Sequence, residues 1–297
     1  MFENILGNNE NKKTLENSVI KGQVLHSYMF TGQAGIGKFL FAKEFAKAIL
    51  CHGKSKPCKI CESCISFEGG NNPDITIIDE EEKSIKTETI KQMVKSVYEK
   101  PIKSSKKVYI INDSEKMTKE AQNSLLKTLE EPPEYVVIIL ITEAENLLLN
   151  TIKSRCTKVK FNSLKSNEIE EILQKKHNIT NISKNILELS AGSAQKALSA
   201  QGKEAIYENI KEIFSNIEKE NLIDLLNKKE IIFKNKDDIL DTLDYINIVI
   251  FNKSKKNLKY IKCIKIVEET KDRLKKNSNY DMTIDNLLLK LWEEVNG

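Results

Sequence analysis

The chain of 297 residues is 40% hydrophobic and 30% charged, and its formal net charge at pH 7 is only +4. That balance is ordinary for a globular protein of about two domains, and it does not by itself indicate nucleic-acid binding, although it allows a local basic face. Without a run of about 18 apolar residues a membrane span is excluded, and without a basic and then apolar N-terminal stretch no signal peptide is predicted. We therefore expect a cytoplasmic protein whose cysteines stay reduced.

The first predicted elements are a helix, a strand, a glycine-rich loop and a second helix. Leu15 and Val19 stand one helical turn apart and predict a helix over residues 9–21. Residues 27–30 predict a short buried strand, and apolar residues recur with helical spacing after Gly37. Strand, glycine loop and helix in this order are the context that a phosphate-binding loop requires.

That loop has the pattern G-x-x-x-x-G-K of a phosphate-binding loop. Gly32, Gly35 and Gly37 would let backbone N–H groups surround phosphate oxygens, and Lys38 would reach the terminal phosphates. The next position normally carries a Ser or Thr whose hydroxyl binds Mg²⁺, but here it is Phe39, which has no oxygen. The loop therefore predicts a nucleotide-binding fold and argues against nucleotide chemistry in this chain.

A cluster of cysteines with the spacing C-x6-C-x2-C-x2-C follows within residues 51–64. Its members are Cys51, Cys58, Cys61 and Cys64. Four closely spaced thiolates suit a tetrahedral structural zinc site with no open position for catalysis. Free cysteines or disulfides are the alternative, although disulfides are not expected in a reducing compartment. Cys156 and Cys263 stand alone and are expected to be ordinary buried residues.

Beyond the cysteines, strands and helices alternate as far as residue 161. Strands are predicted at 74–79, 108–111, 135–141 and 157–161, helices at 87–100 and 118–130, and a charged turn at 80–83. The run at 135–141 is the most hydrophobic of the chain and is rich in β-branched residues, so we expect a central parallel strand there. This alternation predicts a doubly wound α/β sheet.

After residue 161 the pattern is helical. Helices are expected at 166–176 and at 183–200, the second of them interrupted or ended near 190–193. From about residue 205 onward, four apolar stripes with helical spacing predict roughly four or five helices, enough for a bundle.

The strand at 108–111 ends where a nucleotide hydrolase needs carboxylates to hold Mg²⁺ and polarise water. The first position after it is Asn112, whose amide oxygen is a weaker Mg²⁺ ligand than a carboxylate. Asp113 follows directly, so the acidic character of this strand end is reduced but not lost.

Arginine is scarce, because Arg155 and Arg273 are the only two and lysine supplies the other permanent positive charges. Arginine differs from lysine in its planar fork, which matches phosphate and carboxylate oxygens. The count alone allows two explanations of an arginine in this chain: the position needs the chemistry of arginine, or the residue is there by chance.

Several motifs together resemble the AAA+ clamp-loader subunits of bacterial DNA polymerase III. They are T-I-K-S-R-C at 151–156, G-x-x-G-x-G-K at 32–38, the four-cysteine insert, and N-S-L-L-K-T-L-E-E-P-P at 123–133. The resemblance is firm over residues 1–200 and only architectural over 205–297. It implies an AAA+ P-loop domain at 1–161 with a zinc module at 51–64, a small helical lid at 162–204 and a helical collar at 205–297.

In that family the arginine of S-R-C acts in trans, on ATP bound by a neighbouring subunit, where it stabilises the transferring phosphoryl group. The resemblance assigns this role to Arg155, with a surface salt bridge as the alternative. It also aligns Phe39, Asn112 and Gln195 with the Walker A hydroxyl, the Walker B carboxylate and a sensor arginine of the chain's own site. Three altered positions beside a retained Arg155 resemble the delta-prime branch, while Lys38 leaves ATP and Mg²⁺ binding open.

The preferred hypothesis is therefore a non-hydrolysing, delta-prime-type subunit of the DNA polymerase III holoenzyme. The resemblance implies tau/gamma and delta subunits as partners in a hetero-pentamer, with the sliding clamp and primed DNA, bound without sequence readout, as further partners. A lysine-rich segment at 103–107 is either a DNA contact or a solvated loop. The alternatives are an active tau/gamma-type ATPase, disfavoured by the three altered positions, and a structural adaptor acting through its zinc module, disfavoured by Arg155.

Overall fold

The computed structural model describes residues 1–80 and 84–297, so most of the charged turn predicted at 80–83 lies outside the described residues. The chain divides into two compact units, the first made of residues 1–168 with 192–194 and the second of 169–191 with 195–297. Most of the lid and the whole collar expected from the sequence fall in the second unit, and the boundary between them stays a prediction.

The first unit is built on one parallel sheet with the strand order β2-β3-β4-β1-β5. The strands are β1 (Ser27–Thr31), β2 (Ile75–Ile78), β3 (Lys107–Ile111), β4 (Val136–Thr142) and β5 (Thr157–Lys160). β4 lies at the centre with all of its residues buried, which confirms the expectation for the most hydrophobic run. Its partners are both parallel, with Ile138 beside Ser27 of β1 and beside Tyr109 of β3.

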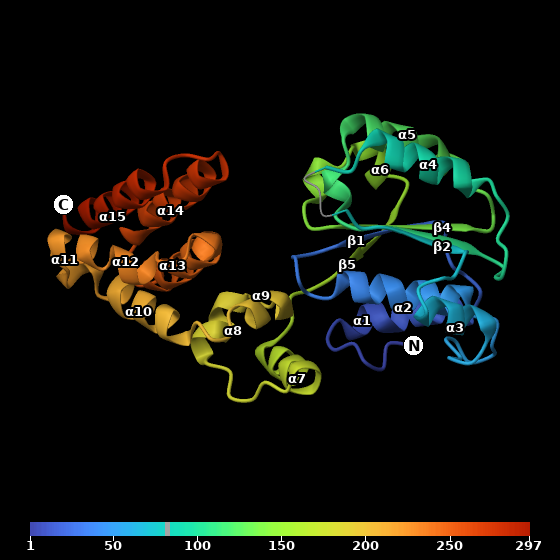
Figure 1. The fold of residues 1–297 in the computed structure, drawn as a ribbon, viewed down its shortest axis with the longest axis horizontal. Helices are drawn as coiled ribbons and strands as arrows, with labels where there is room; N and C mark the ends of the chain where they lie inside the picture. The colour runs from blue at the N-terminus through green and yellow to red at the C-terminus, as the bar shows by residue number, and fades with distance from the viewer. Residues whose placement is uncertain (81–83) are drawn as a thin grey trace. The chain divides into compact units, whose positions relative to one another are not determined.

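Helices cover both faces of this sheet (Figure 1). One face carries α1 (Asn9–Ile20), α2 (Lys38–Leu50) and α3 (Glu62–Glu68), and the other carries α4 (Thr87–Val97), α5 (Lys119–Glu130) and α6 (Asn150–Lys153). The short 3-10 turns η1 (Ser114–Lys116) and η2 (Glu145–Leu147) follow β3 and β4. The doubly wound arrangement expected from the alternating pattern is therefore confirmed.

The sheet separates two hydrophobic cores because neighbouring residues of a strand point to opposite faces. Phe30 of β1 belongs to an aromatic cluster on the α2 side, in contact with Phe45 and Phe161. Met29, the residue before it, belongs to the second core, together with Tyr109 of β3. Both cores consist of buried, closely packed side chains, so the sheet sets the positions of the loops at the strand ends.

All the regular secondary structure described in the second unit is helical. Its helices are α8 (Lys184–Ser190), α9 (Ala194–Ser199), α10 (Glu204–Ser215), α11 (Leu222–Asn227), α12 (Lys229–Ile232), α13 (Ile239–Ser254), α14 (Tyr260–Lys275) and α15 (Tyr280–Asn296), with α7 (Ser166–His177) leading into it and 3-10 turns η3 (Ile217–Lys219) and η4 (Lys236–Asp238) between. The core is apolar and includes Ile210, Phe214, Leu243, Ile246, Val267, Ile284 and Leu288. None of the described helices is both long enough and apolar enough to cross a membrane.

The boundaries differ from the expected ones where local chemistry intervenes. The helix predicted at 183–200 is interrupted as expected, because Ala191 and Gly192 both have positive φ and separate α8 from α9. The helix predicted at 87–100 already ends at Val97, ahead of Pro101. The short helices α3, α6, α11 and α12 were not predicted, because four to seven residues are too few to show a period.

Candidate functional site

The glycine loop joins β1 to α2 at the carboxyl edge of the sheet, where parallel α/β folds bind ligands. Gly35 and Gly37 have φ angles of +70° and +93°, a region that side chains with a Cβ rarely adopt. A Cβ on Gly32 would lie 2.7 Å from the carbonyl oxygen of Phe161 and 2.9 Å from the Ile36 side chain. Glycine is therefore needed at all three predicted positions by the loop itself.

Lys38 is turned into this loop and is only 7% exposed. Its Nζ donates hydrogen bonds to the carbonyl oxygens of Gly32, at 2.7 Å, and Gln33, at 2.6 Å. Burial lowers the pKa of Lys38, and the nearby carboxylates, Glu143 foremost, oppose that effect. The ammonium expected to meet terminal phosphates is thus bound by carbonyl groups of its own loop.

Phe39, at the position of the missing hydroxyl, is half-buried and packs against the aromatic core under α2. The Nζ of Lys43, one helical turn further on, lies 5.6 Å from the centre of the Phe39 ring. The side chain therefore has an apolar, structural environment and offers a metal ion nothing to bind.

The two polar residues directly after β3, Asn112 and Asp113, already have partners within the chain. Asn112 donates to the Asp79 carboxylate at 2.8 Å, and the Asp113 carboxylate forms an ion pair with Lys116 at 2.8 Å. Asp113 adopts φ +44°, so the chain turns sharply at this predicted site residue. Its charge still acts on Lys38, which places it at the edge of the loop site.

Two further carboxylates belong to this edge and were missed by the sequence reasoning. Glu115 accepts a hydrogen bond from the backbone N–H of Glu143 at 3.3 Å, and both carboxylates act on Lys38. The second carboxylate oxygen of Glu115 is buried and has no hydrogen-bond partner among the described residues. Both residues follow the ends of adjacent parallel strands, β3 and β4, and that position is the signal that could have identified them.

Arg155 lies between α6 and β5, just before the start of β5, whereas Lys38 follows the end of the parallel strand β1. The two residues therefore lie toward opposite edges of the sheet. Its Nη2 forms an ion pair with Glu130 at 2.6 Å, and its Nη1 donates to the carbonyl oxygen of Thr151 at 2.8 Å. The side chain is 32% exposed. Arg155 and Lys38 have no partner in common, so the structure does not bring the two predicted basic site residues together.

Gln195, aligned with a sensor arginine, is an exposed residue of α9 in the second unit. Gln195 belongs to the second unit, whereas the glycine loop belongs to the first.

The four clustered cysteines converge. The Sγ atoms of Cys51, Cys58, Cys61 and Cys64 all lie within 4.8 Å of one another and could hold a metal ion. Backbone N–H groups point at the sulfurs, with Cys58 donating to Cys51 at 3.2 Å and Cys61 donating to Cys58 at 3.4 Å. The N–H groups of Ile60 and Cys61 lower the pKa of Cys58 to about 6, whereas burial raises the pKa of Cys51 and of Cys64 in the metal-free cluster. Cys156 and Cys263 are buried elsewhere, as expected.

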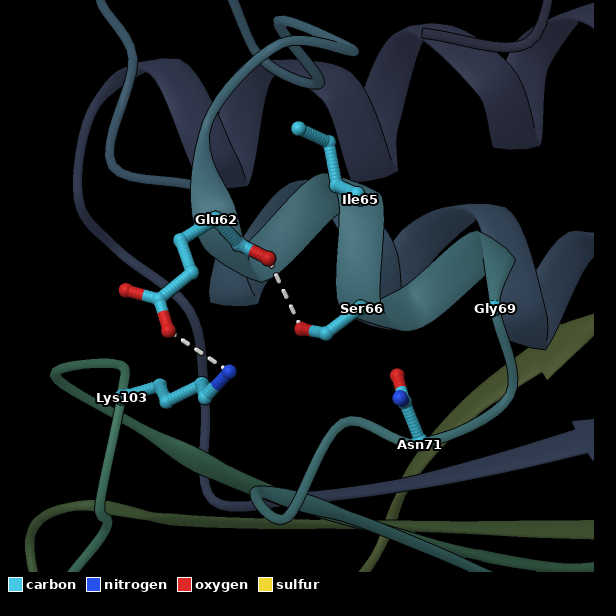
Figure 2. Close-up of a pocket in the computed structure, with 6 residues that line it drawn as sticks. All are labelled: Glu62, Ile65, Ser66, Gly69, Asn71 and Lys103. Atoms are coloured by element: carbon cyan, nitrogen blue, oxygen red, sulfur yellow. Dashed lines mark hydrogen bonds and ion pairs between the residues drawn. The ribbon is translucent and has the colours of Figure 1, made fainter.

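The segment at 103–107 is tied to the cysteine module. Lys103 and Glu62 of α3 form an ion pair of 2.6 Å across a groove of about 510 Å³ (Figure 2). The fully buried carboxylate of Asp74 accepts the backbone N–H groups of residues 102–104 at 2.6–2.7 Å. Lys107 is buried and donates to the carbonyl oxygen of Ser96 at 2.9 Å, and Lys106 donates to the carbonyl oxygen of Glu134 at 2.6 Å. Each lysine of the predicted DNA patch therefore has a partner within the chain.

Comparison with known proteins gives consistent matches. The model of a family described as "DNA polymerase III, delta subunit" matches residues 7–165. The DNA polymerase III subunit delta' of Bacillus subtilis is 40% identical over 162 residues, which are 54% of this chain and 49% of that protein. The DNA polymerase III subunit tau/gamma of Haemophilus influenzae is 36% identical over 174 residues, 58% of this chain and 25% of that protein. The chain thus spans about half the length, or less, of these curated relatives.

Among solved structures, a DNA polymerase III gamma subunit-related protein from Thermotoga maritima superposes with a TM-score of 0.52 at 21% identity. The match covers 95% of this chain and 99% of that one. At this identity the likeness concerns the fold alone, and it confirms the expected fold of a parallel α/β sheet followed by a helical region.

Proposed function

The chain belongs to the family of the DNA polymerase III delta subunit, and on that premise we propose that it is a clamp-loader subunit that hydrolyses no ATP itself and supplies Arg155 to ATP held by a neighbouring subunit. Its role would be delta-prime-like: it helps the assembled loader to open the sliding clamp and place it on primed DNA during replication. The relatives of both the delta' and the tau/gamma kind agree with a part in this machinery.

The observation that carries the proposal is the environment of Phe39. A phosphate-binding loop that works on ATP needs a hydroxyl at this position to hold Mg²⁺, and Mg²⁺ neutralises the charge that develops on the phosphates. Here the position is occupied by a ring packed against the hydrophobic core. Asn112, bonded to Asp79, supplies an amide where a second metal ligand is needed. Both changes affect the same step, so they support a loop kept as a structural turn.

Arg155 supports the other half of the proposal. Its guanidinium is anchored but not buried, with 32% of the side chain exposed. A planar, permanently charged fork on a short rigid segment is suited to meet phosphate oxygens presented by another subunit. Lysine, which this chain uses for nearly every other positive charge, would offer a point charge without this geometry.

We propose that the cysteine module, residues 51–64, holds one structural Zn²⁺. In a tetrahedral site with Zn–S bonds of about 2.3 Å, the sulfurs stand about 3.8 Å apart. The four Sγ atoms, all within 4.8 Å of one another, fit that requirement, and backbone N–H groups point at the sulfurs of Cys51 and Cys58. All four ligand positions would be filled by protein, so the ion would fix the module to the end of α2 without catalysing a reaction.

The proposed partners are the tau/gamma and delta subunits, joined in a hetero-pentamer through residues 205–297, with the sliding clamp and primed DNA bound by the complex. The lysines of 103–107 are engaged within the chain, since Lys103 pairs with Glu62 and Lys107 is buried. We therefore propose that DNA is held by the assembled loader through its phosphates, without relying on this segment alone.

The test is ATP turnover, measured first with the purified chain and then with the loader reconstituted with its tau/gamma and delta subunits. The isolated chain should show no turnover above background. In the complex, Arg155→Ala should lower DNA-stimulated turnover at least about 10-fold, because a trans-acting arginine contributes a factor of roughly 10³ or more at its own site. Arg155→Lys, which keeps the charge and loses the fork, should retain only part of the activity. Turnover at the wild-type level in the Arg155→Ala complex would overturn the proposal.

The alternative function is an active ATPase of the tau/gamma type, and the retained Lys38 is the observation that favours it. Lys38 stands beside the carboxylates of Asp113, Glu115 and Glu143, so a basic group and acidic groups do meet at the loop. Mg²⁺-dependent turnover by the isolated chain that disappears in Lys38→Ala would establish this alternative instead.

A further inference from the structure

Two elements outside its own segment, β1 and α5, hold Arg155 in place. On the side of β1, the hydroxyl of Ser27 donates to the backbone carbonyl oxygen of Arg155 at 2.6 Å. On the side of α5, the carboxylate of Glu130 pairs with Nη2 at 2.6 Å, while Nη1 donates to Thr151 within the same turn. Both the backbone and the guanidinium of Arg155 are therefore fixed by neighbouring elements.

Glu130 stands where its charge is unfavourable for its own helix. It is the last residue of α5, and a carboxylate at a helix C-terminus opposes the helix dipole. Its side chain is 47% exposed, so the ion pair with Arg155 adds little to the stability of the fold. Neither the helix dipole nor the stability of the fold accounts for a carboxylate at this position, whereas its contact with Arg155 does.

The contacts of Arg155 use only part of its donors. A guanidinium has five N–H groups. Nη1 donates to the carbonyl oxygen of Thr151 at 2.8 Å and to the hydroxyl of Ser154 at 3.5 Å, and Nη2 lies in an ion pair 2.6 Å from the Glu130 carboxylate. Within the described part of the chain, the Nε–H group donates no hydrogen bond. A guanidinium with donors to spare can form parallel hydrogen bonds to phosphate oxygens.

We propose that Glu130 is a positioning residue for Arg155. Its carboxylate holds Nη2, so that the guanidinium keeps a single orientation before an ATP phosphate of the neighbouring subunit arrives. Pre-organisation of this kind contributes to the rate because a small displacement of a charged group from its working position is costly. This inference rests on the trans-acting role proposed above for Arg155.

The experiment compares Glu130→Ala with Glu131→Ala in the reconstituted complex of the chain with its ATPase subunits. Glu131 is the next residue, is also exposed at the end of α5, and forms no ion pair within the described part of the chain, so its removal changes the same charge without touching Arg155. We expect Glu130→Ala to lower kcat for ATP about 3- to 10-fold with the KM for ATP unchanged, because the nucleotide itself is bound by the other subunit. Glu131→Ala should behave as wild type, and Glu130→Gln, which keeps an acceptor oxygen, should fall between.

The decisive arm combines Glu130→Ala with Arg155→Ala. If Glu130 acts through Arg155, the double variant has the same kcat as Arg155→Ala alone. An equal further loss in the double variant would mean that Glu130 supports the fold and would overturn the inference, as would a kcat raised by Glu130→Ala. Loss of turnover in Arg155→Ala together with wild-type turnover in Glu130→Ala would overturn only this inference. Wild-type turnover in Arg155→Ala would instead overturn the proposed function on which it rests.

Discussion

Lys38 and Gln33 close the glycine loop on itself, through a hydrogen bond of 2.6 Å from the lysine ammonium to the backbone carbonyl oxygen of Gln33. The carbonyl oxygen of Gly32, at 2.7 Å, is a second acceptor for the same ammonium. A phosphate that entered the loop would have to replace both acceptors, and Phe39 beside it would bring no metal ion to help. The carbonyl groups of the loop therefore satisfy the Lys38 ammonium without a nucleotide.

The first prediction follows from Phe39. Any affinity of the isolated chain for ATP should be the same with Mg²⁺ and with a chelator, because the loop offers the metal no hydroxyl. Phe39→Thr should make ATP binding dependent on Mg²⁺ and should lower the free energy of unfolding by about 1–2 kcal/mol, since a half-buried ring is lost from the core. Calorimetric titration with ATP, with and without Mg²⁺, and urea denaturation measure the two effects.

The neighbouring residue provides the control for this substitution. Leu40 follows Phe39 in α2 but is 46% exposed, so Leu40→Thr should change neither the Mg²⁺ dependence nor, beyond about 0.5 kcal/mol, the stability. Wild-type protein that binds ATP ten times more tightly when Mg²⁺ is present would show that another group supplies the metal ligand, and the account of Phe39 would fail.

The elements that carry strong local signals could be predicted from the sequence. β4 was predicted as the central strand because a short run of β-branched apolar residues is typical of a parallel strand buried on both faces. All residues of β4 are buried. The glycine loop was predicted because its residues meet a steric requirement, seen at Gly32, where a Cβ would collide with the Phe161 carbonyl. The cysteine cluster was predicted because its members are close in sequence, and the fold brings all four together.

Contacts between distant positions could not be predicted in the same way. The pairing of Lys103 with Glu62 and the capping of residues 102–104 by Asp74 join segments about 30 to 40 residues apart, and nothing in the lysine-rich segment itself indicates them. The same holds for Glu143, which comes to the loop site only because β4 lies between β3 and β1 in the sheet. The sequence of one segment shows which charges it carries. The residues that pair with those charges depend on the order of the strands in the sheet.

The second prediction concerns the cysteine module. Purified protein should contain one Zn²⁺ per chain, and Cys58→Ser should abolish its retention, because a serine hydroxyl does not replace a thiolate ligand at neutral pH. Removal of the ion with a strong chelator should lower the free energy of unfolding by roughly 2–4 kcal/mol, since metal binding to the folded module is linked to stability. Elemental analysis and thermal denaturation before and after chelation provide the measurements.

Cys156 supplies the matched variant, because it is a buried cysteine outside the cluster. Cys156→Ala should keep the full zinc content. The difference in free energy of unfolding between this variant and wild type should be the same before and after chelation. Metal-free protein isolated under conditions that preserve zinc in other proteins, with an unchanged melting temperature, would remove the zinc assignment.

The third prediction concerns Asp244, which joins α9, α13 and α14 in the second unit. Its carboxylate is paired with Lys196 at 2.6 Å and with Lys271 at 2.7 Å. Burial alone would raise the pKa of Asp244, but the two lysines outweigh it and the pKa lies below its usual value. A depressed carboxyl pKa means that the pairing stabilises the fold above the unfolded-state pKa of about 3.9 and that this stability is lost as the pH falls through the folded-state pKa.

Asp244→Asn should therefore lower the free energy of unfolding at pH 7 by about 1 kcal/mol, a figure discounted for solvent screening because the side chain is 31% exposed. The difference from wild type should shrink as the pH is lowered below about 4, because the wild-type carboxyl then becomes neutral as well. Urea denaturation at a series of pH values measures this, with exposed Asp272→Asn of α14 as the variant that should match wild type throughout. A difference between Asp244→Asn and wild type that stayed constant down to pH 3 would show that the variant acts through packing, because a charge effect must disappear when the charge does.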